Sequence, residues 1–162
     1  MKRWDQRPIE IRNLFNPAFC GLVLFRSFCG YDEEDHRGMP FSLALLILPL
    51  CLHKESRDIL SKGNRSYFLK IISDHPQLLV NFGRRATDLL PFTLEALGLM
   101  MQLGAFEVRS GGRLKALPEH VRKSVTGTPE SVACQRVGRF LGKEFARVAD
   151  RATIYTTLGV RP

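Results

Sequence analysis

Two apolar segments near the N-terminus most constrain what this chain can fold into. Residues 17–30 follow Asn16-Pro17, and residues 40–53 begin at the proline of Gly38-Met39-Pro40. Proline at the first helical position loses no hydrogen bond, and an asparagine before it can cap the first turn. Both segments are apolar over most of a helical circumference, which is typical of centrally buried helices. We therefore expect a mainly α fold organised around this helical pair.

The chain is predicted to be one domain spanning residues 1–162, because it has 162 residues of which 44% are apolar. Residues 1–60 contain an N-terminal arm and the apolar helical pair. The longest apolar run, residues 41–52, is shorter than the roughly 20 residues that span a bilayer. No apolar signal-peptide core follows the first basic residues. We expect a cytoplasmic protein with no membrane contact.

Residue chemistry indicates no catalytic, cofactor or metal site. The sequence has no P-loop and no nucleophile–base pair at a recognisable spacing. Its cysteines form no C-x-x-C pair and no cluster with histidine at zinc spacing, so they are predicted to be free thiols. The four consecutive carboxylates of residues 32–35 lack the alternation and the glycine of a calcium loop. We interpret this run as a solvated loop.

Residues 77–116 are predicted to form a winged-helix-like unit. Residues 77–90 have a helical period, and Pro91 is expected to start a second helix that ends at Gly104. Apolar and polar residues alternate on both sides of Ser110-Gly111-Gly112, which is typical of a β-hairpin. Helix, turn, helix and hairpin is the order of a winged helix, in which the second helix reads DNA and the hairpin is the wing.

The charge of this unit argues against base reading. Residues 86–108 contain no Lys or Arg, and Gln102 is the one residue of the second helix of a type that commonly contacts bases. Its apolar surface suits burial against another protein. Arg109, Arg113 and Lys115 in the hairpin are candidates for contact with the DNA backbone, while a solvated hairpin is the alternative.

Residues 128–162 are predicted to form C-terminal helices. Thr128 and Pro129 begin a long helix that reaches about residue 149, and Asp150 begins a short one. On a helical wheel the apolar face is Cys134, Val137, Leu141, Phe145 and Val148. The basic stripe on the opposite face also carries Arg151, and its partner-binding candidates are Arg136, Arg139, Phe140, Lys143 and Arg147. A solvated face, the DNA backbone and an acidic partner surface all remain open for this stripe.

Four motifs resemble one protein family. They are R-N-L-F-N-P-A-F-C-G at residues 12–21, G-M-P-F-S-L-A at 38–44, L-P-L-C-L-H-K at 48–54 and I-Y-T-T-L-G-V-R-P at 154–162. Together, and in this order, they resemble the middle component of bacterial three-component ABC systems. These systems are conflict and anti-phage modules that include the Lamassu-type antiviral defences.

The resemblance implies a small non-enzymatic subunit without a cofactor. Its implied partners are an SMC/Rad50-like ABC ATPase and an effector, often a nuclease, with any DNA contact made non-specifically through the complex. The alternative is a free-standing winged-helix DNA-binding regulator, which the net charge of +8 and the basic hairpin support. An enzyme is the third hypothesis.

Overall fold

The computed structural model describes residues 3–63 and 66–161, and it confirms a mainly α fold with a small antiparallel sheet. Its elements are η1 (Trp4–Gln6), α1 (Ile9–Leu14), α2 (Pro17–Asp32), β1 (Met39–Pro40), α3 (Phe41–Ala44), α4 (Ile47–Cys51), α5 (Lys54–Lys62), α6 (Phe68–Asp74), η2 (Pro76–Leu79), α7 (Phe82–Gln102), β2 (Phe106–Arg109), β3 (Arg113–Ala116), η3 (Pro118–His120), α8 (Pro129–Val148) and α9 (Arg151–Thr157).

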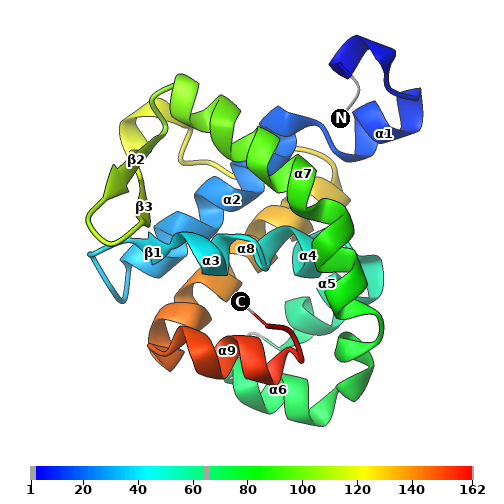
Figure 1. The fold of residues 1–162 in the computed structure, drawn as a ribbon, viewed down its shortest axis with the longest axis vertical. Helices are drawn as coiled ribbons and strands as arrows, with labels where there is room; N and C mark the ends of the chain where they lie inside the picture. The colour runs from blue at the N-terminus through cyan, green and yellow to red at the C-terminus, as the bar shows by residue number, and fades with distance from the viewer. Residues whose placement is uncertain (1–2, 64–65, 162) are drawn as a thin grey trace.

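Helix α2 is the central element, as the sequence predicts (Figure 1). The Asn16 side chain accepts hydrogen bonds from the N–H groups of Ala18 and Phe19, and Pro17 begins the helix. Most of the helix is buried, chiefly against α8 and then α7. A Cβ added at Gly142 of α8 would collide with the backbone oxygen of Ser27, so the two backbones approach as closely as glycine permits.

The second apolar segment is not the single helix that the sequence predicts. Pro40 pairs with Arg113 in the sheet, and the helical residues after it divide into α3 and α4. The Phe41 N–H donates to the Gly112 carbonyl at 3.0 Å, which ties the start of α3 to the hairpin turn. Pro49 has no N–H to donate to a carbonyl four residues earlier, so a continuous helix would lose a hydrogen bond there. Most of the segment is nevertheless buried, as expected.

The helix-turn-helix predicted for residues 77–103 is not formed. Helix α7 continues through Pro91, and residues 76–79 form a 3₁₀ turn before it. Pro91 is exposed, so water can satisfy the carbonyl that would otherwise accept its missing N–H. The hairpin is confirmed as β2 and β3, and β1 extends it to the order β1-β3-β2. The winged-helix assignment is therefore not confirmed.

Aromatic contacts join the sheet and the small helices to the core. Phe106 of β2 lies with its ring centre 4.6 Å from that of Phe28 on α2. Phe68 of α6 meets Phe145 of α8 edge to face at 5.1 Å. Figure 1 shows the sheet and α1 on opposite sides of α2, with α6 and α9 together at a third edge.

Candidate functional site

Helix α8 carries the partner-binding candidates, and its boundaries follow from its sequence. The Thr128 hydroxyl accepts from the Ser131 N–H at 3.2 Å, and Pro129 takes the first helical position. The predicted apolar face is confirmed, because Cys134, Val137, Leu141 and Phe145 are buried and Val148 packs against the core. The opposite face is exposed over much of its length, but its cations do not share one environment.

Three of the candidate cations lie against the end of α2. The Glu33 carboxylate is 2.5 Å from the Arg139 guanidinium and 3.2 Å from the Lys143 ammonium. Glu34 lies 3.5 Å from Lys143 and 3.1 Å from Arg147. Carboxylates are unfavourable near a helix C-terminus, and the α8 cations offset that interaction.

The hairpin cations meet the same acidic segment. Lys115 lies 3.1 Å from Asp32, and Arg113 lies 3.6 Å from Asp35. Arg109 pairs with its neighbour Glu107.

Residues 32–35, here called the acidic run, therefore bridge α2, α8 and the hairpin. The prediction of a solvated loop holds only in part, because Glu33 and Glu34 are exposed but the run also pairs with cations of α8 and the hairpin. These cations lie more than 70 residues away in sequence, so the pairing cannot be read from the run itself. The pKa of Asp35 falls to about 2, chiefly because the Arg37 guanidinium donates to its carboxylate. Across the described ranges, no group of three or more His, Cys, Asp or Glu could hold a metal ion.

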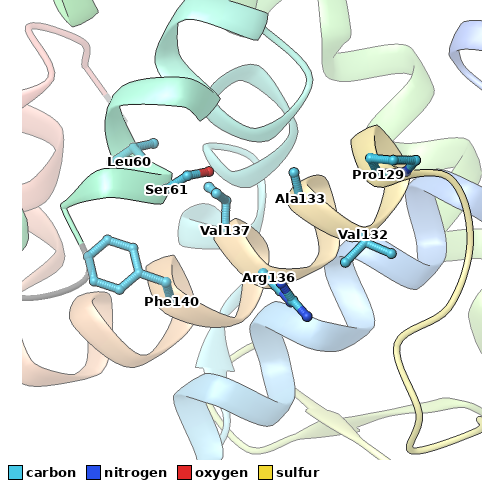
Figure 2. Close-up of a pocket in the computed structure, with 8 residues that line it drawn as sticks. All are labelled: Leu60, Ser61, Pro129, Val132, Ala133, Arg136, Val137 and Phe140. Atoms are coloured by element: carbon cyan, nitrogen blue, oxygen red, sulfur yellow. The ribbon is translucent and has the colours of Figure 1, made fainter.

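Arg136 and Phe140 belong to a different environment, a pocket between α5 and α8 with a volume of about 350 Å³ (Figure 2). Figure 2 shows the α8 residues along one side and two α5 residues along the other. The lining residues are Leu60, Ser61, Pro129, Val132, Ala133, Arg136, Val137 and Phe140.

The pocket combines an apolar wall with one exposed guanidinium. Phe140 is half-buried and packs against the core, while Arg136 is exposed. Arg136 forms no ion pair with any residue in the described part of the chain. No carboxylate, imidazole or thiol is among the described lining residues. Such an arrangement can bind an apolar side chain that has a carboxylate beside it.

A buried arginine near this pocket was missed from the sequence. Arg26 of α2 is 4% exposed, and its Nε donates to the Gln135 side chain at 3.2 Å. Its other nitrogens donate to the carbonyls of residues 122, 123 and 124, at 2.7 to 3.3 Å. Burial lowers the pKa of Arg26. The one available signal was its position inside an apolar helix, where a cation needs partners.

A second buried arginine fixes the start of α8. Arg57 of α5 is 3% exposed and lies 2.5 Å from Glu130. It also donates to the carbonyls of Cys51 and Leu52. The pocket wall is therefore held in place from α5 as well as from α2.

Fold and site together define a class, a mainly α-helical protein whose α8 face presents an apolar pocket edged by an arginine. The chain belongs to Middle Component 3 of the ABC-three component (ABC-3C) systems, whose family model matches residues 4–162. This confirms the resemblance of the four sequence motifs. A middle component is an accessory subunit of its system.

The other comparisons add no relative. Nothing matches the chain among curated proteins or among solved structures. In the ranges that the structure describes, no helix has the length and apolar character needed to cross a membrane.

Proposed function

We propose that this chain is a non-enzymatic adaptor subunit of an anti-phage ABC three-component system. It binds an SMC/Rad50-like ATPase and links that ATPase to an effector. Membership of a three-component system supports the existence of protein partners. The observation that carries the adaptor role is the pocket at α5 and α8, where an unpaired Arg136 stands beside a half-buried Phe140.

Arginine and aromatic residues are enriched at protein interfaces, where a desolvated aromatic anchor contributes most of the binding energy. In this proposal Phe140 is the anchor and Arg136 receives a carboxylate of the partner. Arg139, Lys143 and Arg147 extend the same surface by exchanging the acidic run for carboxylates of the partner. Their present pairing makes them secondary to Arg136.

The proposed adaptor contacts DNA only weakly and without sequence preference. Arg109, Arg113 and Lys115 are the candidates for the DNA backbone, and each is already paired with a carboxylate. A free-standing regulator would need a reading helix, and α7 continues through the position where the turn was expected. The regulator hypothesis keeps the net charge and the basic hairpin that favoured it, but it lacks the separate reading helix that it requires.

Co-purification of the tagged chain with the other two components of its system tests the proposal. Arg136→Glu should place a carboxylate against a carboxylate and abolish recovery of one component. Phe140→Ala should weaken that complex by roughly 1–3 kcal/mol. Arg161→Glu, at an exposed arginine outside the pocket, is the matched control. Melting curves establish that each variant is folded, and full recovery of both components by both pocket variants would contradict the proposed site.

A further inference from the structure

Helix α7 presents an exposed apolar row on the outside of the molecule. Leu90, Leu94, Gly98 and Met101 follow the i, i+4, i+8, i+11 spacing that places side chains along one side of a helix. The three apolar side chains are 37%, 45% and 36% exposed. Their exposure places the row on the side of α7 away from the core, and Figure 1 shows α7 crossing in front of α2. We call these four residues the α7 row.

Gly98 is the informative member of the α7 row. Glycine is among the poorest helix formers, so its presence inside a long helix calls for a reason. Elsewhere the reason is a close backbone, because a Cβ added at Gly30 would meet the Arg139 oxygen and one at Gly138 would lie 2.9 Å from the Val23 oxygen. At Gly98 no heavy atom of the described residues lies within 4 Å of an added Cβ. No internal contact accounts for this glycine.

We infer that the α7 row docks a helix of a partner subunit. A row spaced by four residues is the ridge that packs between the ridges of another helix. Leu90 and Leu94 supply the ridge, and Gly98 supplies a gap that a large side chain of the second helix can fill. The molecule uses the same device internally at Gly21 of α2, where an added Cβ would collide with the Met100 side chain of α7.

The charges along α7 indicate which kind of molecule can dock on the α7 row. Residues 86–108 contain no Lys or Arg although the chain carries a net charge of +8. The carboxylates along this stretch are Asp88, Glu95 and Glu107. Arg7 holds Glu95 and Arg109 holds Glu107, while Asp88 is 68% exposed and lies 3.7 Å from the exposed Arg84, a surface ion pair that a partner's cation can replace at little cost. Residues 86–108 offer a nucleic acid no cation, and a second α7 would bring the same carboxylates. The occupant that fits is a helix with an apolar face and Lys or Arg at its margins.

The size of the α7 row also favours a partner over a second copy. Three partly exposed side chains fall short of the roughly 800 Å² per subunit that a stable dimer buries. A partner that is held at another surface as well can use a small row. This inference rests on the proposed adaptor function, which requires two separate docking surfaces, and the α8 pocket is the other.

The test measures binding of the full chain to each of the other two purified components by biolayer interferometry, with melting curves alongside. Gly98→Leu fills the gap and should weaken binding of one component roughly tenfold or more. Gly98→Ala should raise the melting temperature by about 2–4 °C, because alanine is the better helix former, and yet weaken the same binding by about threefold. If Gly98 had only a structural role, Gly98→Ala would raise the melting temperature without weakening binding.

Ser73→Leu, at an exposed position of α6, is the control for adding an apolar side chain elsewhere. Wild-type affinity of both Gly98 variants for both components, with the wild-type chain binding at least one, would overturn this inference and leave the adaptor function standing. A wild-type chain that binds neither component would overturn both. A wild-type dimer that Gly98→Leu separates would assign the α7 row to a second copy and overturn the partner helix.

Discussion

The Lys143 ammonium lies 3.2 Å from the Glu33 carboxylate, although 110 residues separate them in sequence. Arg139 and Arg147 pair with the same acidic run. An acidic partner or a phosphate backbone that approaches this part of α8 must therefore compete with carboxylates of the chain itself. The competition limits non-specific binding to a chain whose net charge is +8.

Removing the Glu33 and Glu34 carboxylates should make the cations of α8 available to an anionic partner. The double variant Glu33→Gln and Glu34→Gln frees Arg139 and Lys143 and leaves Arg147 paired with Glu144 alone, so it should bind duplex DNA more tightly at low salt. Each further phosphate that these cations neutralise should steepen the log–log dependence of affinity on salt by about 0.9. Fluorescence anisotropy across a salt series measures both. Asp58→Asn with Asp74→Asn is the control, because it changes the net charge equally by removing exposed carboxylates of α5 and α6. Equal behaviour of the two double variants would show that net charge alone matters.

Two adjacent leucines should respond differently to the same substitution. Leu46 is 2% exposed, so Leu46→Asp buries an unpaired charge and should give insoluble protein, because the cost approaches the stability of a whole domain. Leu45 is half-buried at the wall of a surface pocket, where a carboxylate can remain hydrated. Leu45→Asp should remain soluble with a lowered melting temperature. Soluble, cooperatively melting Leu46→Asp protein would mean that this segment is not part of the core.

The features that could be predicted from the sequence are those whose causes are local. Asn16 and Thr128 each precede a proline, and Asp150 precedes a third helix, so all three caps were predicted from neighbouring residues. Proline was misleading at Pro91, where its signal for a helix start was overridden by packing of α7 against the core.

The sequence predicted which helix carries the candidate site, but it did not predict that the basic stripe of this helix divides between two environments. The helical wheel placed Arg136 and Arg139 on one stripe, and this remains correct for the helix alone. Their different environments depend on what α2 and α5 bring to α8. Glu33 reaches Arg139 from α2, while Leu60 of α5 forms the pocket with Arg136. Spacing along one helix carries no information about either neighbour.

Arg26 should limit the access of proteases to residues 122–124, the segment before α8. Arg26→Met removes the donors to the carbonyls of residues 122–124 and should lower the free energy of unfolding by about 1–3 kcal/mol. Trypsin cleaves after Arg122 and Lys123, so limited trypsin digestion should cut the variant faster at these two bonds. Arg84→Met, at an exposed arginine of α7, is the matched control. Unchanged cleavage at both bonds would show that other contacts hold this segment.

Asp35 should contribute an acid-sensitive part of the stability. Its pKa is lowered from 3.8 to about 2 in the folded chain, so the folded state favours the ionised carboxylate. That contribution is present above pH 3.8 and is lost as the pH falls through about 2. Urea unfolding should therefore show wild type more stable than Asp35→Asn at pH 6, with the difference shrinking as the pH falls from 4 to 2. A difference that stays constant across this range would assign the effect of the substitution to packing.

The close crossing of α2 and α8 has a consequence for the order in which the chain folds. Helix α2 ends at Asp32 and α8 begins at Pro129, so nearly the whole chain must leave the ribosome before the two can meet. Contacts between such distant segments slow folding, and the apolar surface of α2 remains exposed during synthesis. Newly made chains are therefore expected to depend on chaperones until α8 emerges, and truncation before residue 129 should leave α2 as the segment that drives aggregation.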